Sequence, residues 1–223
     1  MLGTVCSGGV HGVDAFLVYV ECDISDGFPG FELVGSLSNE VRECKERVMT
    51  SLRNYGVLIP NKRITVNFSP ANLKKQGTGY DLAVALSLLL SMGIIEKERI
   101  DNTLVLGELM LSGGLGKVRG VLPIVREAKN NGIKRCIVPN ENYREAAVVD
   151  GITVISANTL PQLLSYLTGE GAEPESVENR IEPLKKAKED SYDLKNVAAI
   201  VLTANISPRH CFTKVTYKGR GYG

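Results

Sequence analysis

The sequence has few of the residues that usually build metal sites and disulfide frameworks. It contains two histidines, His11 and His210, and no Cys-x-x-Cys pair. Its five cysteines lie far apart, at positions 6, 22, 44, 136 and 211. This odd number and wide spacing exclude the common zinc patterns and a disulfide network. We expect Cys44 and Cys136 to act as small core residues and the chain to reside in a reducing compartment.

Signals for secretion and membrane insertion are also lacking. The first residues, MLGTVCSGGVHGVDAF, contain no basic region followed by an apolar core, which a signal peptide would need. The longest apolar run, residues 82–92, is too short to span a bilayer. We therefore predict a cytoplasmic location and no membrane partner.

The formal net charge is only +1, and the charges are unevenly distributed. Residues 194–223 contain no acidic residue and five basic ones, which are Lys195, Arg209, Lys214, Lys218 and Arg220. Residues 1–193 hold 21 basic and 25 acidic residues, a net charge of −4. A body of this charge is not expected to bind nucleic acid strongly by electrostatics alone.

The 223 residues are 43% hydrophobic and 23% charged, which is ordinary for a globular domain with its own core. Alternating apolar and polar residues predict an opening meander of strands over residues 1–36 and another strand over 62–69. Shorter strands are predicted over 103–107, 135–138 and 152–155, with a hairpin across 112–116.

Helices are predicted between these strands. After Ser38, which can act as an N-cap, the apolar residues Val41, Cys44, Val48 and Leu52 recur every three or four positions until Gly56. Residues 82–92 are apolar on every side, so this helix is expected to be central and buried. Further helices are predicted from about Val121 to Gly132, from Glu141, and over 160–167. The predicted fold class is α+β, a sheet packed with helices.

Composition changes after the last predicted helix. Residues 169–190 have few large apolar residues, two prolines and dense charge, which is typical of a linker. We therefore divide the chain into a domain over 1–168, a charged linker over 169–193 and a basic tail over 194–223.

A glycine loop, Gly77-Thr78-Gly79, precedes the buried helix. Its backbone amides could approach an anion. Asp81, however, lies in the first turn of that helix, where its carboxylate already uses the helix dipole. We interpret the loop as a tight strand-to-helix turn with an acidic cap rather than as a phosphate site.

A second glycine-rich segment, GGLGK at residues 113–117, is only superficially similar to a Walker loop. The Walker pattern needs a glycine at position 111 and a serine or threonine at position 118, where this chain has Leu111 and Val118. Without that hydroxyl there is no magnesium ligand. We interpret the segment as a hairpin and expect no cofactor and no metal in this chain.

No acid–base pair is evident either. Glu40 and Glu43 share a helix face, but the basic residues Arg42, Lys45 and Arg47 around them indicate a solvated surface. The remaining candidates are isolated in the sequence, and His11, between Val10 and Gly12, is typical of a turn; they are His11, Asp14, Glu21 and Asp23.

Four blocks of the sequence together resemble a known family. They are FPGFELVGSLSNEVRECKERV, PNKRITVNFSPANLKKQGTGYDLAVAL, LGELMLSGGLGKVRGVLPI and KRCIVPNEN. From about residue 2 to residue 193, their order and spacing are similar to the amino-terminal region of the ComM/YifB family of magnesium-chelatase-like AAA+ ATPases. The resemblance implies a two-layer fold like the Lon protease domain. For full-length members it implies a motor that uses ATP and magnesium, hexameric assembly, and a link to DNA branch migration in natural transformation and recombination.

Lon peptidases use a serine nucleophile and a lysine base. Residues 75–78, Lys-Gln-Gly-Thr, match the stretch before that serine, so Gly79 stands at the nucleophile position and the lysine position falls near Leu122. Both members of the dyad are absent, and the resemblance therefore implies no peptidase activity. The remaining enzymatic alternative is a shifted nucleophile at Thr78, with Lys74, Lys75 or Lys117 as its base.

We predict a non-catalytic domain that works with its own ATPase domain and contacts DNA. Ammonium and guanidinium groups match phosphates, and the expected DNA contacts are Lys74, Lys75, Lys117 and Arg119. A solvated surface at these positions is one alternative. A protein-interaction module without DNA contact is another.

The family pattern stops after residues 191–197. The remaining residues, AAIVLTANISPRHCFTKVTYKGRGYG, resemble neither the helix nor the Walker loop that the family has next. A truncated or frame-shifted gene accounts for this and for the acid-free composition, and a basic binding tail is the alternative. In either case we expect this chain to lack the ATP-binding motor.

Overall fold

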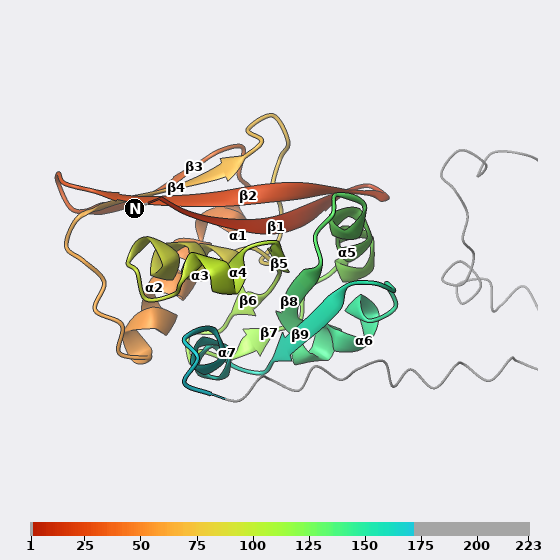
Figure 1. The fold of residues 1–223 in the computed structure, drawn as a ribbon. Coiled ribbons are helices and arrows are strands. Elements are labelled where there is room, and N and C mark those ends of the chain that lie inside the picture. Colours follow the sequence, from red (N-terminus) through yellow and green to blue (C-terminus); the bar gives the residue numbers. More distant parts are fainter. Residues whose placement is uncertain (1, 172–223) are drawn as a thin grey trace, which may run out of the picture. The chain divides into compact units, whose positions relative to one another are not determined.

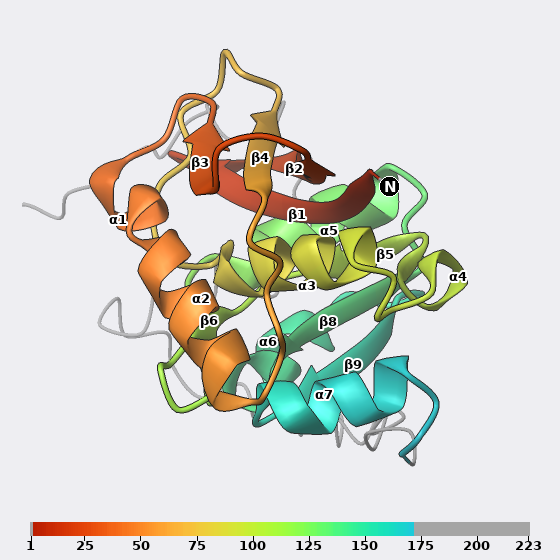
Figure 2. The same ribbon diagram turned by 90° about the vertical axis from the view of Figure 1, so that its left-hand side faces the viewer.

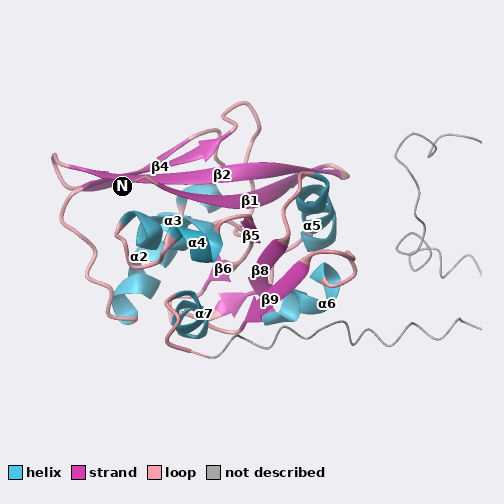
Figure 3. Cartoon of the chain, viewed as in Figure 1, coloured by secondary structure: helices cyan, strands magenta, loops and turns pink. Residues whose placement is uncertain are grey.

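The computed structural model describes residues 2–171 and contains a mixed sheet of seven strands (Figures 1 and 3). The strand order across the sheet is β3-β4-β2-β1-β5-β8-β9. The predicted linker from residue 172 onward and the whole predicted tail over 194–223 lie outside the described residues.

The first half of the sheet is mainly antiparallel. β1 (Gly3–His11) and β2 (Asp14–Ser25) form a hairpin. Gly12 makes its turn at φ 63°, a left-handed conformation that favours glycine. β4 (Arg63–Ser69) pairs antiparallel with β2, and β3 (Gly30–Val34) pairs parallel with β4.

The predicted meander over residues 1–36 is therefore wrong in its last strand. β4 lies between β2 and β3, because its buried residues Ile64, Val66 and Phe68 continue the apolar face of β2 and all its residues find partners there. The shorter β3 adds to the outer side of β4 and forms the edge of the sheet. The order of strands along the chain therefore differs from their order across the sheet.

The second half of the sheet is parallel. Its strands are β5 (Thr103–Val105), β8 (Arg135–Pro139) and β9 (Thr153–Ala157). β5 joins β1 through the partners Cys6 and Leu104. All three strands lie within a residue or two of the strands predicted from the sequence.

Short elements connect these parallel strands. α5 (Val121–Asn130) precedes β8, and the 3-10 turn η1 (Asn140–Asn142) with α6 (Tyr143–Ala146) precedes β9. A separate hairpin of β6 (Glu108–Leu109) and β7 (Leu115–Gly116) confirms the hairpin predicted across residues 112–116.

α3 (Asp81–Ser91) is buried along its whole length and packs against β1 and β2 (Figure 2), which confirms the helix predicted over residues 82–92. α2 (Cys44–Asn54) packs beside α3. The remaining helices are α1 (Asn39–Arg42), α4 (Lys97–Ile100) and α7 (Leu160–Leu167). Within residues 2–171, no helix has the length and apolarity that a membrane crossing requires.

The helix predicted after Ser38 is divided in two. α1 ends at Arg42, and Glu43 separates it from α2. Ser38 occupies the N-cap position of α1, but its hydroxyl makes no capping bond. Val41 and Cys44 are buried on either side of the break, so both pieces keep the predicted apolar stripe.

Helices pack on both faces of the sheet, and two apolar clusters result. Alternate residues of a strand point to opposite faces, and β8 shows this division. Ile137 belongs to the larger cluster with residues of α2, α3 and α7, whereas Cys136 and Val138 belong to a second cluster with residues of α5 and α6. The predicted fold class, a sheet packed with helices, is confirmed.

The cysteines of the described residues are free. Cys44 and Cys136 are fully buried, which confirms their predicted role as core residues. Burial raises the pKa of both thiols to about 12, so both are protonated thiols at neutral pH.

Candidate functional site

Polar side chains converge on residues 75–81, which are the glycine loop before α3 and the first residue of that helix. The Gly79 carbonyl accepts the Gly107 N–H at 3.0 Å, and the Gly107 carbonyl accepts the Leu82 N–H at 3.0 Å. A Cβ at Gly107 would lie 3.1 Å from the Leu82 side chain, so glycine permits this close approach. The loop is therefore held against the segment that follows β5.

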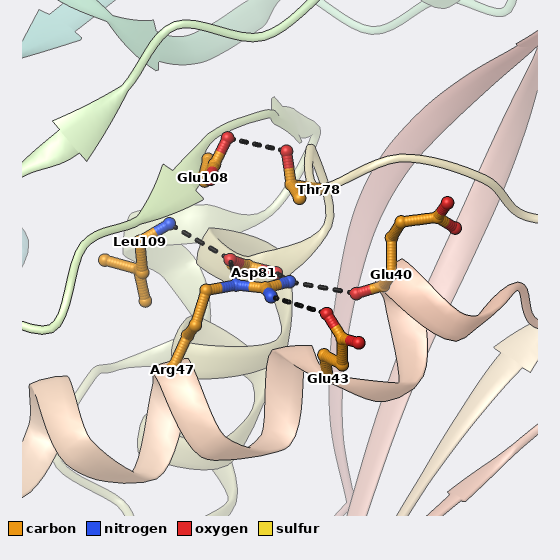
Figure 4. Close-up of polar contacts among 7 residues, drawn as sticks. All are labelled: Glu40, Glu43, Arg47, Thr78, Asp81, Glu108 and Leu109. Carbon is orange, nitrogen blue, oxygen red and sulfur yellow. Dashed lines mark hydrogen bonds and ion pairs between the residues drawn. The ribbon is translucent and has the colours of Figure 1, made fainter.

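Asp81, the first residue of α3, forms a bidentate ion pair with Arg47 of α2 (Figure 4). Arg47 Nε lies 2.6 Å from Asp81 Oδ2, and Arg47 Nη2 lies 2.9 Å from Asp81 Oδ1. The carboxylate also accepts the Leu109 N–H at 3.2 Å, and Arg47 donates to the Glu40 carbonyl at 3.0 Å. The Asp81 side chain is only 1% exposed and that of Arg47 18%, so this pair links α2, α3 and β6 in the interior.

This pair corrects two expectations. Within the described residues, the Asp81 carboxylate bonds to Arg47 and Leu109 instead of capping the amides of its own helix. Arg47 is not part of a solvated surface, because its guanidinium turns inward to a carboxylate 34 residues away. Burial raises the pKa of Asp81 and Arg47 opposes that rise, while the hydrogen bond to Asp81 raises the pKa of Arg47. An incoming phosphate would meet a carboxylate already at this helix end.

Thr78 is engaged by a carboxylate. Its hydroxyl donates to Glu108 Oε2 at 2.6 Å (Figure 4). Glu108 starts β6, so the bond joins the glycine loop to the small hairpin. This geometry gives Thr78 a structural bond to a carboxylate and not the amine base that the peptidase alternative needs.

Lys75 is buried, with no exposed surface. Its ammonium group donates to the Phe68 carbonyl at 3.0 Å and to the Pro70 carbonyl. Burial lowers the pKa of the ammonium group. The prediction that Lys75 contacts DNA is therefore corrected, because its cationic end points into the protein and a phosphate cannot reach it.

The other predicted DNA contacts have a different environment. Lys74, Lys117 and Arg119 are all exposed. Lys74 belongs to the glycine loop region, and Lys117 and Arg119 follow β7. These three side chains remain available to a ligand, and the DNA contact itself stays a prediction.

Neither dyad position carries a reactive group. Gly79 has an ordinary backbone conformation, and a Cβ there would lie 3.6 Å from the Val118 side chain, a normal contact. Leu122 lies in the first turn of α5, and its N–H donates to Glu145 Oε1 at 3.0 Å. The helix end near the lysine position is thus bound by a carboxylate.

Asn142 supports the same region. It is completely buried, its Oδ1 accepts the Val118 N–H at 2.9 Å, and its Nδ2 donates to the Val118 carbonyl at 2.9 Å. Sequence reasoning did not single out Asn142, Glu145 or Glu108. The available signals were that Asn142 lies in the block KRCIVPNEN and Glu108 in the block LGELMLSGGLGKVRGVLPI, both of which carry part of the family resemblance.

The remaining acidic and histidine candidates do not form one cluster within residues 2–171. His11 and Asp14 are exposed and face each other across the β1–β2 turn. Glu21 Oε2 accepts a hydrogen bond from Asn67 at 2.8 Å on the sheet, and Glu43 lies 3.9 Å from Arg47. Among residues 2–171, no three histidine, cysteine, aspartate or glutamate side chains gather closely enough to hold a metal ion.

Residues 20–142, more than half of the chain, match the family described as subunit ChlI of Mg-chelatase. The chain therefore belongs to this magnesium-chelatase-like family, and the resemblance to ComM and YifB is confirmed. It is similar to the competence protein ComM of Haemophilus influenzae, with 31% identity over 220 residues, which is 99% of this chain and 42% of ComM. An uncharacterised protein of Mycobacterium tuberculosis is 44% identical over 168 residues, 75% of this chain and 33% of the relative.

The relationship extends to a peptidase. Lon protease 2 of Bacillus subtilis is 32% identical over 144 residues, 61% of this chain and 25% of that protein. The fold is thus related to the Lon protease domain, as expected. The chain spans between a third and about two fifths of the length of the ComM and Mycobacterium relatives.

Proposed function

We propose that this chain is a non-catalytic domain of a ComM/YifB-type ATPase that takes part in DNA branch migration, recombination or natural transformation. One observation carries the non-catalytic part. The two dyad positions hold Gly79 and Leu122, while the polar groups of the loop, Lys75, Thr78 and Asp81, are each bonded to other parts of the fold.

The proposal assigns the chemistry to another part of the complete protein. ATP and magnesium would bind a separate ATPase domain, which would be the main partner of this domain in a cytoplasmic ring, a hexamer by family resemblance. The name of one relative, competence protein ComM, supports the link to natural transformation. The segment at residues 113–117 lacks the Walker residues and forms part of the β6–β7 hairpin, which supports leaving nucleotide binding to that other domain.

The peptidase alternative gives a direct test. We expect the purified chain not to cleave unfolded, fluorescently labelled casein, because neither Gly79 nor Leu122 supplies a nucleophile or base and Thr78 donates to Glu108. Release of acid-soluble fluorescence measures cleavage. Thr78→Ala should give the same baseline as wild type, and Thr4→Ala, which changes an exposed threonine of β1, is the matched control. Cleavage that Thr78→Ala abolishes and Thr4→Ala retains would contradict the proposal.

DNA contact is tested by charge reversal at the three exposed positions. We expect labelled single-stranded DNA to bind at low salt, and the triple variant Lys74→Glu, Lys117→Glu, Arg119→Glu to weaken binding by about tenfold or more. The slope of log affinity against log salt should also become shallower, by about 0.7 for each phosphate that the variant no longer neutralises. The DNA assignment fails if no binding is measured by fluorescence anisotropy.

A matched triple variant separates specific contacts from a general charge effect. Lys97→Glu, Arg126→Glu and Lys134→Glu make the same charge change at exposed positions elsewhere and are expected to retain most of the affinity. Equal losses in the two triple variants would mean that the predicted positions have no special role.

A second candidate function is a protein-interaction module without DNA contact. The net charge of −4 over residues 1–193 favours it, because an acidic body repels a polyanion. Light scattering with and without DNA distinguishes the two, since such a module should assemble identically in both conditions.

A further inference from the structure

A groove of about 490 Å³ lies on the molecule apart from the glycine loop. Its walls come from α2, the start of β3, β4 and the segment 57–62, and no residue of the loop 75–81 lines it. The proposed function does not use this groove.

The floor of the groove is apolar. Phe31 and Ile64 belong to the main core and are almost fully buried beneath it, and Met49 packs partly against the same core. Leu58 also lines the groove but is 90% exposed. A large apolar side chain at the rim of an apolar floor offers surface that a ligand can remove from water.

The rim of the groove is cationic. Lys45, Arg53 and Lys62 line it, and none of its lining residues is acidic. Lys45, Met49 and Arg53 are spaced four residues apart, so they lie along one side of α2. Within the described residues, neither Lys45 nor Arg53 has a carboxylate at ion-pair distance.

The third cation, Lys62, forms only an exposed ion pair. Lys62 Nζ lies 2.9 Å from Asp26 Oδ1, but both side chains are more than half exposed. Ion pairs of this kind contribute little and exchange readily with other partners. All three cations can therefore meet carboxylates of an incoming ligand.

We propose that this groove binds a segment of a partner protein in which large apolar residues are flanked by carboxylates. The apolar side chains cover Leu58 and the floor between Met49 and Phe31, and the carboxylates pair with Lys45 and Arg53. An amphipathic segment docking in an apolar groove is a common recognition mode. The positive charges at the rim favour a segment with negative charges.

Single-stranded DNA fits this groove less well. Nucleic acid strands bind to exposed aromatic faces on which bases stack, and the one aromatic residue among the lining residues, Phe31, is only 9% exposed. Because the ring of Phe31 is almost fully buried, the apolar floor favours apolar side chains of a protein over stacked bases.

The test uses the full chain and a fluorescein-labelled peptide, SDEFDELLDG, in an anisotropy titration. We expect saturable binding. Two matched peptides define the chemistry: SKKFKKLLKG reverses the charges, and SDEADEAADG removes the large apolar side chains. Each is expected to bind at least about tenfold more weakly, because each lacks one of the two matching features.

Protein variants locate the binding surface. The double variant Lys45→Glu, Arg53→Glu is expected to weaken binding of SDEFDELLDG by about tenfold, and Leu58→Ser by about fivefold. Leu58 is almost fully exposed, so Leu58→Ser tests the groove without disturbing the core. The matched double variant Arg42→Glu, Arg126→Glu, at exposed positions outside the groove, is expected to bind like wild type.

Three results would overturn the proposal. The first is no binding of SDEFDELLDG, and the second is equal affinity for the charge-reversed peptide or for the groove variants. The third is tighter binding of oligothymidylate that Lys45→Glu, Arg53→Glu abolishes, which would make the groove a nucleic-acid site instead.

Discussion

Arg47→Met is expected to lower the free energy of unfolding by about 3 kcal/mol. Methionine retains an unbranched apolar side chain at this position of α2. It leaves the Asp81 carboxylate, which is only 1% exposed, without its cation. Removing one partner of a buried ion pair costs more than the pair contributes, because the remaining charge stays desolvated. Urea denaturation followed by circular dichroism measures the change.

Two further variants test the cause of this loss. Arg42→Met changes an exposed arginine of α1 and should change stability by less than about 0.5 kcal/mol. Adding Asp81→Asn to Arg47→Met removes the unpaired charge and should restore part of the lost stability, so the two effects are not additive. A double variant less stable than Arg47→Met would mean that the ion pair is not the source of the effect.

The pH dependence of Arg47→Met has a definite sign. Burial raises the pKa of Asp81 and Arg47 opposes the rise, so the variant has a folded-state pKa further above the unfolded value of about 3.9. A group with a raised folded pKa contributes stability below the unfolded pKa and loses it as pH rises through the folded pKa. The difference between wild type and Arg47→Met should therefore shrink as the pH falls from 7 towards 4. A difference that grows over this range would contradict the assignment.

Lys75→Met is expected to lower the free energy of unfolding by about 2 kcal/mol. Methionine fills much of the volume of the buried side chain, but the carbonyls of Phe68 and Pro70 lose their donor, and a buried unsatisfied acceptor costs about 1 to 3 kcal/mol. Thermal and urea unfolding both measure this. Lys74→Met changes an exposed neighbour of the same type and should have an effect below about 0.5 kcal/mol.

The same two variants separate structure from DNA contact. Lys75→Met should leave DNA affinity unchanged at a temperature where it is fully folded, whereas Lys74→Met should weaken it. If Lys75→Met unfolds like wild type and binds DNA more weakly, the ammonium group is not held inside as the structure places it.

Local pattern predicted most of the fold. Residues 82–90 of α3 are apolar on every side apart from Ser87, which predicted a buried helix, and Cys44, Val48 and Leu52 recur at the spacing of one helix face. The structure confirms both. The position of β3 was not predictable in this way, because pairing with β4 depends on which strands fit side by side. Sequence spacing gives the elements, and packing between them decides their neighbours.

The polar site was predicted less well, for a physical reason. Asp81 and Arg47 are 34 residues apart and Thr78 and Glu108 are 30 apart, so nothing local shows that they meet. Lys75 appears in sequence as one of two adjacent lysines in a polar loop, and only the carbonyls of Phe68 and Pro70 distinguish it from exposed Lys74. Gly79 and Leu122, by contrast, were assigned through the family resemblance.

The space around Gly79 has a consequence for how the domain relates to its peptidase relatives. Its backbone is not in the left-handed region, and a Cβ would meet Val118 only at a normal contact distance. The backbone therefore leaves room for a Cβ at this position, so neither the local conformation nor a close contact of the Cβ imposes glycine here. The lysine amine of the dyad is missing, because the corresponding position in α5 holds Leu122. The backbone N–H of Leu122 already donates to Glu145. Fold and dyad are therefore separable in this family, because the chain keeps a fold related to the Lon protease domain while the two dyad positions hold Gly79 and Leu122.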